Sequence, residues 1–547
     1  MAAKRKMPVG EQSFQNLRND GCVYVDKTQY LYNLVTQGRY YFLSRPRRFG
    51  KSLFLSTLEA YFLGKQELFK GLYLEHAEPE LAAEEEREAW QEHPVLSLSL
   101  NEERFASEFE LNNTLNLALV KWERRYGLDP EEKTYSSRLR GIIERAYEQT
   151  GRQVVVLIDE YDKPLLDTLH RPELHQTCKE ILHAFYSVLK GSSEYLRFVF
   201  LTGVTRFSKV GIFSGLNNLE DISMRSAYAG MCGITEAELT TDFVQEIEAL
   251  AEELTLPLDE TLALLRKRYD GYLFTPRKEY VYNPFSLLNV FKSKELGDYW
   301  YATGTPTFLV EKLKRERHYL PSFEKGVVVA KTILENYSTD SQDIVPVLFQ
   351  AGYLTIRDYQ PKKEAYLLGF PNEEVKYSFL SNIQPILAPY PMTLLSGGTA
   401  VWEFQDAIET GDVAQMMEKI ESLLAGVPYD NINEVQYRER DAQVALYLIF
   451  TLLGKFVETE VHNNKGRADI IVHTDEVIYI FELKLWSAGT PEDAIAQIEA
   501  QGYATPYQAS HKKVLLIGAS FDEEKRNIGA WAVKADGRKS DDSPLGA

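Results

Sequence analysis

The fold is decided by the stretch "YYFLSRPRRFGKSLFLSTLEAYF", residues 40–62. Its apolar start, "YYFLS", predicts a buried strand, and the apolar residues after Ser52 recur at the three-four spacing of a helix. The basic loop between them ends in Gly50-Lys51-Ser52. Such a loop binds phosphate when backbone N–H groups and a helix N-terminus converge on the anion and a lysine reaches the terminal phosphates. The order of strand, loop and helix therefore predicts a phosphate site in an α/β domain.

The loop departs from the usual pattern at its head, where Arg45 stands in place of the expected glycine. Pro46 stiffens the turn and the arginines add positive charge. Gly50 lets the chain approach the anion, Lys51 supplies charge, and Ser52 offers a hydroxyl to Mg²⁺. A Gly-Lys-Ser triplet occurs by chance in many proteins, so its position between a strand and a helix carries the prediction. The expected ATP-binding residues are Arg45, Pro46, Arg47, Arg48, Phe49, Gly50, Lys51 and Ser52.

An acidic motif, "VVVLIDEYDKP", follows at residues 154–164. Its apolar run delivers Asp159 and Glu160 to the carboxyl edge of the sheet, where open α/β sheets bind their ligands. We expect Asp159 to hold Mg²⁺ through a water molecule and Glu160 to polarise the attacking water. A buried strand that simply ends in surface acids is the alternative.

A further strand, "RFVFLTG" at residues 197–203, brings two more candidates. Thr202 at its tip could sense the γ-phosphate, and Arg206 could stabilise transition-state charge in cis or in trans. An ion-pair or surface role for Arg206 is the open alternative. The strand at residues 95–100 falls between the two motifs along the chain, which suits the class of ATPases with an extra strand there.

The length of 547 residues predicts two to four domains. The composition limits the kinds of partner that the chain can bind. The net charge of -19 argues against general polyanion binding, so a nucleic-acid partner requires a local basic patch. The three cysteines lie far apart and are expected to be idle thiols in a reducing cytosol. No apolar segment approaches the roughly 20 residues of a spanning helix. We therefore expect a cytoplasmic protein.

The order of strand-like and helical patterns divides the chain into parts. Residues 1–232 alternate between the two and predict a parallel sheet covered by helices. Residues 233–398 are expected to form a mainly helical lid or connector. Residues 399–535 predict a second, smaller α/β domain, and residues 536–547 a disordered tail.

A second chemistry is indicated by "GRADIIVHTDEVIYIFELK", residues 466–484. Two strand-like runs are joined by a turn, so Asp469 at the start of one strand and Glu482 at the end of its partner can meet. Lys484 points to the same face as Glu482 because side chains alternate along a strand. Two carboxylates beside a lysine form a Mg²⁺ site that could activate a water. A hairpin with acids at its ends is the commonplace alternative.

The motifs together resemble those of a known family. Those that carry the likeness are "FLSRPRRFGKSLFLSTLEAYF", "VVVLIDEYDKPL", "FLTGVTRFSKVGIFSGLNNLEDIS", "YDGYLF", "VYNPFSLLNVF" and "LFQAGYLTI". The chain looks like the bacterial proteins that join an AAA-ATPase-like domain to a C-terminal PD-(D/E)XK nuclease domain, and the likeness covers nearly its whole length. In that family the arginine-rich loop replaces the standard phosphate loop.

The resemblance also implies roles for residues of the second domain. Metal would be bound by Asp469, Glu482 and the carbonyl of Leu483, and Lys484 would be the electrostatic or proton-handling group. Glu439 and Gln497, on the flanking helices, would support them. The family has a histidine one turn after the glutamate, whereas this chain has Gln443 there, which puts the role of that position in doubt.

Our leading hypothesis is an ATP-hydrolysing, Mg²⁺-dependent nuclease in which nucleotide state gates access to nucleic acid, with DNA favoured over RNA. One alternative is a nucleotide-dependent switch or assembly protein whose nuclease fold binds a partner without cleaving. Another is an ATP site that binds without turnover. Oligomeric state is left open, since AAA-type ATPases often assemble into rings.

Overall fold

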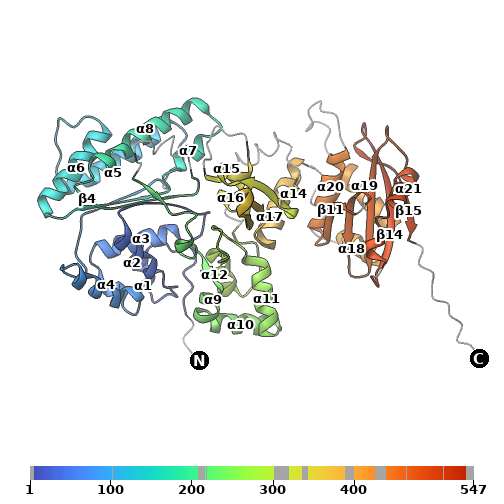
Figure 1. The fold of residues 1–547 in the computed structure, drawn as a ribbon, viewed down its shortest axis with the longest axis horizontal. Coiled ribbons are helices and arrows are strands. Elements are labelled where there is room, and N and C mark those ends of the chain that lie inside the picture. Colours follow the sequence, from blue (N-terminus) through green and yellow to red (C-terminus); the bar gives the residue numbers. More distant parts are fainter. Residues whose placement is uncertain are drawn as a thin grey trace, which may run out of the picture. The chain divides into compact units, whose positions relative to one another are not determined.

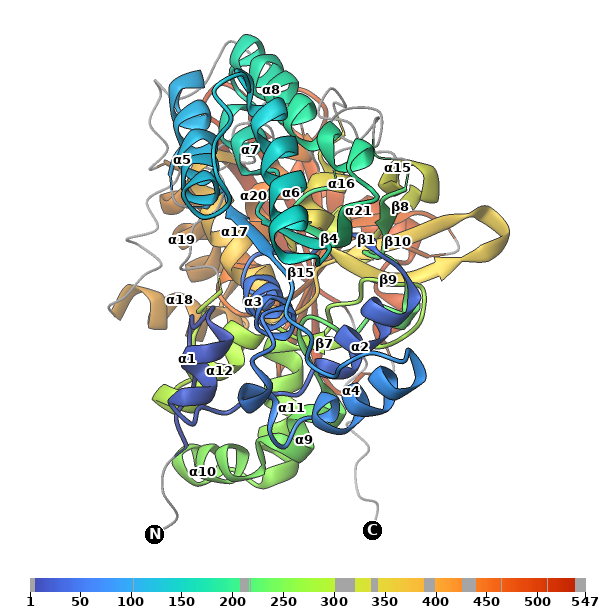
Figure 2. The same ribbon diagram turned by 90° about the vertical axis from the view of Figure 1, so that its left-hand side faces the viewer.

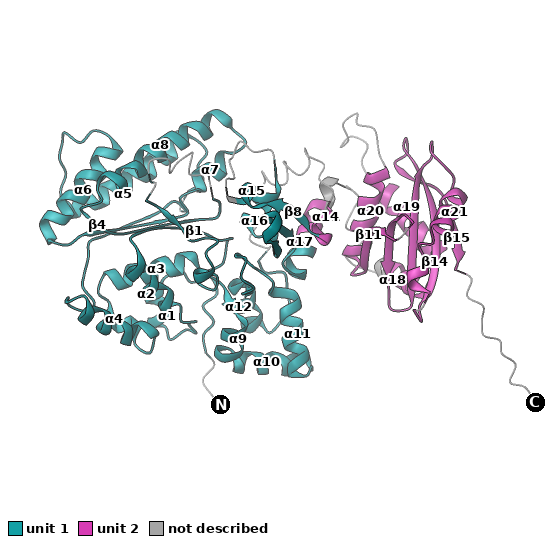
Figure 3. Cartoon of the chain, in the orientation of Figure 1, with its two compact units in different colours: residues 1–309, 326–376 teal, residues 310–325, 377–547 magenta. Residues whose placement is uncertain are grey.

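The structure is a computed structural model of the chain. The residues it describes are 5–101, 103–206, 216, 218–300, 320–335, 343–387, 399–425, 439–463, 465–508 and 510–536. The chain forms two compact units, coloured separately in Figure 3. Unit 1 consists of residues 1–309 and 326–376, and unit 2 of residues 310–325 and 377–547. No helix among the described residues is long and apolar enough to cross a membrane.

Unit 1 is built on a five-stranded sheet of parallel strands in the order β2-β3-β4-β1-β5. The strands are β1 Tyr40–Ser44, β2 Val95–Ser99, β3 Val154–Asp159, β4 Leu196–Gly203 and β5 Glu220–Asp221. β1 and β3 are buried along their whole length, as expected of unbroken apolar runs at the centre of a parallel sheet. The predicted α/β class is confirmed. The strand between β1 and β3 in the sheet is β4, however, while β2 lies at the edge.

Helices cover both faces of this sheet, as Figure 1 shows. One face carries α1 Phe14–Asn19, α2 Thr28–Gln37, α3 Lys51–Phe62 and α4 Tyr73–Glu84. The other carries α5 Glu108–Tyr126, α6 Tyr135–Thr150, α7 Lys163–Thr168 and α8 Pro172–Gly191. The sequence fixes the ends of α6 locally: Thr134 and Ser137 form a capping box, and Gly151 closes the helix with a left-handed backbone.

The rest of unit 1 combines helices with small sheets. The helices are α9 Glu236–Asp242, α10 Val244–Leu254, α11 Leu258–Tyr269, α12 Pro284–Ser293, α15 Lys331–Glu335 and α16 Val345–Ala351. The strands are β6 Ile234–Thr235 and β7 Val281–Tyr282, which pair, and β8 Val327–Ala330, β9 Thr355–Gln360 and β10 Ala365–Gly369. The last three form an antiparallel sheet, whose β9–β10 hairpin extends as a yellow arm in Figure 2. Sequence reasoning missed this sheet because charged residues interrupt the apolar alternation of β9.

Unit 2 contains a mixed five-stranded sheet in the order β11-β12-β13-β14-β15, in which only β13 and β14 pair in parallel. The strands are β11 Phe456–His462, β12 Arg467–His473, β13 Val477–Leu485, β14 Lys513–Asp522 and β15 Asn527–Ala535. The helices are α14 Ser322–Lys325, α18 Thr399–Thr410, α19 Val413–Ala425, α20 Glu439–Leu452 and α21 Pro491–Gln501, with α17 Glu373–Leu387 divided between the units. Apart from Asp536, the predicted tail lies outside the described residues.

Candidate functional site

The candidate phosphate loop connects the end of β1 to the start of α3 at Lys51. Two of its residues have a left-handed backbone, Arg48 with φ 67° and Gly50 with φ 88°. A Cβ at position 50 would meet no atom within 4 Å, so the glycine is needed for its backbone conformation and not for space. The loop thus leads into a helix N-terminus, where unpaired N–H groups and the helix dipole favour an anion.

The ammonium of Lys51 points back toward the start of this loop. Its Nζ donates hydrogen bonds to the carbonyl oxygens of Arg45 and Pro46, each at 3.0 Å. The side chain is buried although it carries a charge. Carbonyl dipoles offset that charge only in part, so the loop retains positive potential for a phosphate.

Of the two acids predicted at the end of β3, Glu160 lies within electrostatic range of this lysine. Asp159 is buried, and its Oδ1 accepts a hydrogen bond from the backbone N of Glu160 at 3.0 Å. Burial raises the pKa of the Glu160 carboxyl, while the nearby charge of Lys51 opposes that rise. Glu160 also has a left-handed backbone, with φ 51°. A carboxylate of raised pKa near a lysine is suited to accept a proton from water.

The end of β4 contributes Thr202, which pairs in register with Leu43 of β1. Its Oγ1 is buried and has no hydrogen-bond partner among the described residues. Asp162 fixes the segment that follows, because its carboxylate accepts hydrogen bonds from the backbone N of Val204 and from the backbone and hydroxyl of Thr205. Sequence reasoning missed Asp162, although the last acid of "DEYD" was a visible signal.

Arg206 is engaged in an ion pair, which was the alternative to its catalytic role. Its Nε and Nη2 lie 2.8 and 2.6 Å from Oδ2 of Asp221. Its backbone N donates to Oε1 of Gln350 at 2.9 Å, which ties the end of β4 to α16. In the described part of the chain, Nη1 of this guanidinium is buried without an acceptor.

The side chain of Arg45, a residue expected to bind ATP, contacts backbone carbonyls instead. Its guanidinium is buried and donates to the backbone carbonyls of Ser44, Ser223 and Tyr228, with the ring of Phe274 4.4 Å away. Burial lowers its pKa to about 10. The arginine at the head of the loop therefore joins β1 to the segment after β5, and its own charged group is taken up by carbonyls.

The other loop residues are supported by the second half of unit 1. Phe49 is buried and packs edge-on against Tyr272 and Phe274, and the guanidinium of Arg48 lies over the ring of Phe285. Trp300 donates its Nε1–H to the carbonyl of Arg47 at 3.1 Å. Pro46 packs so closely on Gly352 that any Cβ there would collide with it. Ser52 is half-buried in the first turn of α3.

In unit 2 the predicted hairpin brings its two acids together. Oδ2 of Asp469 accepts a hydrogen bond from the backbone N of Leu483 at 2.8 Å, so it lies directly beside Glu482 on the neighbouring strand. Oε1 of Glu482 accepts from Nζ of Lys484 at 3.2 Å and from the amide of Gln497. The same amide accepts from Lys484 through its Oε1 at 2.8 Å.

Negative charge dominates this site. Burial, with repulsion from Glu439, raises the pKa of Asp469 to about 6, against the favourable effects of Leu483 N–H and Lys484. Burial and the charge of Asp469 raise the pKa of Glu482 to about 7, again opposed by Lys484. One lysine therefore faces carboxylates that repel one another, and a divalent cation would relieve that repulsion.

The oxygen atoms present fit a magnesium ion. Oε2 of Glu482 is buried and has no hydrogen-bond partner among the described residues. Carboxylate and carbonyl oxygens are the ligands that Mg²⁺ prefers, usually with several waters retained. No group of three His, Cys, Asp or Glu side chains arranged to hold a metal occurs in the described ranges. A metal here would therefore rest on Asp469, Glu482, the Leu483 carbonyl and water.

Gln443 has a definite place in this site, despite the doubt raised by its departure from the family pattern. Its Nε2 donates to Oδ1 of Asp469 at 2.7 Å from the buried face of α20. The glutamine thus orients Asp469, a task that a histidine N–H could also perform. Glu439 begins the same helix and acts on the two carboxylates through its charge.

Comparison with known proteins agrees with both halves of this description. Residues 8–213 match the family model described as a predicted AAA-ATPase, and residues 437–531 match that of the PD-(D/E)XK nuclease superfamily. The chain is 35% identical over 539 residues to an uncharacterized protein in the vnfD 5'region of Azotobacter chroococcum mcd 1. The aligned region covers 97% of this chain and 99% of that protein. The chain belongs to the family that joins these two domains, and the resemblance seen in its motifs is confirmed.

We predict that Arg45→Met destabilises unit 1 by about 2–4 kcal/mol, because three buried carbonyls lose their donor while relief of a buried charge offsets part of the cost. Arg48→Met, the same substitution at an exposed position of the loop, is the control and should lower the free energy of unfolding by no more than about 1 kcal/mol, the usual value of an exposed cation–π contact such as that with Phe285. Urea unfolding measures both. Equal effects of the two substitutions would contradict the structural role of Arg45.

A second prediction concerns charge repulsion in unit 2 without metal. Because the native pKa of Glu482 exceeds its unfolded value, the native state binds the proton more tightly, and stability falls as pH rises from 5 to about 8. Glu482→Gln should therefore raise the free energy of unfolding by roughly 1–3 kcal/mol near pH 8 and barely change it near pH 5. Urea unfolding in EDTA at the two pH values tests this, and a gain independent of pH would refute it.

Proposed function

We propose that the chain is an ATP-hydrolysing protein with a Mg²⁺-dependent nuclease domain that acts on nucleic acid, with DNA favoured over RNA. The observation that carries the nuclease assignment is the unpartnered, buried Oε2 of Glu482 beside Asp469 and Lys484. A buried carboxylate oxygen without a donor is costly unless something occupies the site. In the proposed scheme, nucleotide state gates the access of nucleic acid to the nuclease domain.

In the nuclease reaction, Asp469 and Glu482 would hold the metal, which lowers the pKa of a bound water and neutralises the phosphate. Gln443 fixes one oxygen of Asp469 and Leu483 N–H fixes the other. Lys484 lies within hydrogen-bond distance of Glu482 and Gln497, so its ammonium could stabilise charge on the scissile phosphate or protonate the leaving oxygen.

In the ATPase reaction, Lys51 would exchange its two carbonyl partners in part for the terminal phosphates of ATP. Ser52 and Asp159 would hold Mg²⁺, and Glu160 would accept a proton from the attacking water. Thr202, whose hydroxyl lacks a partner among the described residues, could donate to the γ-phosphate. Arg206 could contribute transition-state charge only by sharing or leaving Asp221.

A nucleotide-dependent switch or assembly protein is the second candidate, in which the nuclease-like domain binds nucleic acid or a partner without cutting. The net charge of -19 favours the form of this reading in which the partner is not a polyanion. Metal dependence separates the two: cleavage requires Asp469 and Glu482, whereas simple binding survives their loss.

We predict that Glu482→Ala lowers cleavage of nucleic acid by at least about 100-fold, because the metal loses a ligand that supplies several kcal/mol of transition-state stabilisation. Glu476→Ala, an exposed acid in the turn of the same hairpin, is the matched control and should cut like the wild type. The assay incubates the full chain with Mg²⁺, ATP and a panel of single- and double-stranded substrates. If wild type and Glu482→Ala leave every substrate equally intact, the nuclease assignment fails.

For the ATPase we predict that Glu160→Gln slows steady-state phosphate release by about 10²–10⁴-fold, the usual effect of losing a general base, while ATP still binds. Lys51→Ala should instead abolish ATP binding. Turnover and equilibrium binding are measured on the same preparations. Equal phosphate release by wild type and Glu160→Gln would remove Glu160 as the catalytic residue and favour a site that binds without turnover.

A further inference from the structure

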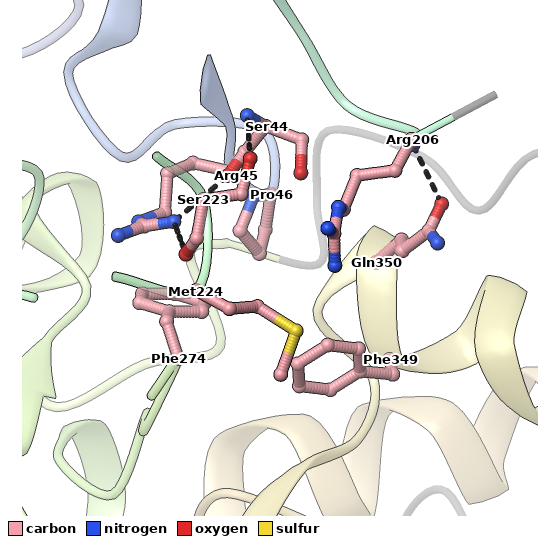
Figure 4. A pocket seen from close by; sticks show the side chains of 9 residues that line it. All are labelled: Ser44, Arg45, Pro46, Arg206, Ser223, Met224, Phe274, Phe349 and Gln350. Carbon is pink, nitrogen blue, oxygen red and sulfur yellow. Dashed lines mark hydrogen bonds between the residues drawn. The ribbon is translucent and has the colours of Figure 1, made fainter. Parts of the chain in front are cut away.

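A small pocket opens in unit 1 beside the head of the phosphate loop (Figure 4). Its walls come from the end of β1, the segments after β4 and β5, the stretch between α11 and β7, and α16. The lining side chains used below are Arg45, Pro46, Arg206, Met224, Phe349 and Gln350. One side of the pocket is thus rich in N–H donors, and the other is apolar.

Gln350 presents an unsatisfied donor on this wall. The residue is 5% exposed, and its Oε1 accepts the backbone N–H of Arg206 at 2.9 Å. That contact fixes the amide orientation, because a backbone N–H requires the oxygen and not the nitrogen to face it. Nε2 is consequently left buried, with no acceptor among the residues that the structure describes.

Arg206 presents a second hydrogen-bond donor without an acceptor. Asp221 occupies Nε and Nη2 of the guanidinium, and Nη1 is buried without an acceptor in the described part of the chain. In Figure 4 the guanidinium of Arg206 lies beside Pro46 and above Met224, within the pocket. Two buried donors of one pocket that lack acceptors are unusual, since more than nine in ten buried polar groups are paired.

The charge of the pocket has the matching sign. Arg206 is balanced by Asp221, but the guanidinium of Arg45 is hydrogen-bonded to backbone carbonyls alone. One positive charge therefore remains without a directly bonded carboxylate among the described residues. A ligand that supplied acceptor oxygens and one or more negative charges would satisfy both the donors and the charge.

We propose that this pocket binds a phosphoryl group, with Nη1 of Arg206 and Nε2 of Gln350 as the recognising donors. The pocket is small, so it suits a single phosphoryl group better than an entire nucleotide. Arg45 and Pro46 line the pocket and also bind the ammonium of Lys51 through their backbone carbonyls, so a phosphate chain on the loop would pass close by.

The phosphoryl group has two sources: the terminal phosphate of bound ATP, or free inorganic phosphate. The first source rests on the proposed ATPase function, and the second does not. In the first case Gln350, on α16, reports the nucleotide to the second half of unit 1. In the second case the pocket holds the phosphate released by hydrolysis.

The test uses the full chain in Mg²⁺-free buffer, with binding of inorganic phosphate measured by calorimetry. Gln350→Glu keeps the oxygen that accepts from Arg206 N but replaces the donor with a negative oxygen. Gln350→Met removes the donor without adding charge, so the proposal stays testable if the first variant fails to fold. Gln176→Glu, the same substitution on the exposed surface of α8, is the control.

If the source is free phosphate, the wild type and Gln176→Glu bind it, and both Gln350 variants bind it at least about tenfold more weakly, as expected for losing a hydrogen bond to a charged group. If the source is the nucleotide, the ratio of ATP to ADP affinity falls by about tenfold in both Gln350 variants while ADP affinity is unchanged. If phosphate affinity and the ATP to ADP ratio are both unaffected by the Gln350 variants, the pocket takes only water and the proposal is overturned.

Lys51→Ala separates this inference from the proposed function. Loss of nucleotide binding in that variant, with phosphate binding that remains sensitive to Gln350, supports both the phosphate loop and the pocket. Nucleotide binding that survives Lys51→Ala would defeat the proposed ATP site, while the phosphate titration would still decide the pocket.

Discussion

Unbalanced charge at buried positions is the constraint on which the two candidate sites depend. In unit 2 the fold brings Asp469 next to Glu482 and offers one ammonium in return. In unit 1 it buries the ammonium of Lys51, whose hydrogen-bond partners in the described part of the chain are carbonyl oxygens, with the carboxyl of Glu160 within electrostatic range. Buried charges cost free energy unless partners satisfy them. The first site would therefore be stabilised by a cation and the loop of the second by a phosphate, and both are the partners that phosphoryl-transfer chemistry supplies.

Polar side chains one step removed keep the charged groups in place. Asp162 accepts hydrogen bonds from the backbone beyond β4, and Gln350 on α16 accepts one from the backbone of Arg206. In unit 2, Gln443 and Gln497 donate hydrogen bonds to the two carboxylates. Each makes hydrogen bonds from a regular element or its immediate end. Their geometry is thereby tied to the packing of helices and strands, which is what a preorganised site requires.

The sequence predicted the fold class and both motifs because each follows from local physics. An apolar run must be buried, a Gly-Lys-Ser turn must open a helix, and alternation along a strand puts Glu482 and Lys484 on one face. The order of strands in the sheet did not follow, since the chain order of β2 and β4 says nothing about which of them pairs with β1. The β9–β10 hairpin was also missed, because its partly exposed strands lack a clear apolar alternation.

The contacts that sequence reasoning did not foresee are those whose partners lie far along the chain. Arg45 was expected to face phosphate, but its partners Ser223 and Tyr228 are brought near only by the tertiary fold. Gln443 was doubted because its type departs from the family, although an amide N–H satisfies the same carboxylate oxygen that a histidine could. Conversely, Asp469 and Glu482 were found because the hairpin that joins them is local.

The most direct test of the central claim is the number of divalent cations that the full chain binds without nucleotide. Electron paramagnetic resonance with Mn²⁺ counts them, and comparison with Asp469→Asn assigns them. The account predicts one site per chain in the wild type and none in Asp469→Asn. No bound Mn²⁺ in the wild type, or a site that persists unchanged in Asp469→Asn, would contradict it.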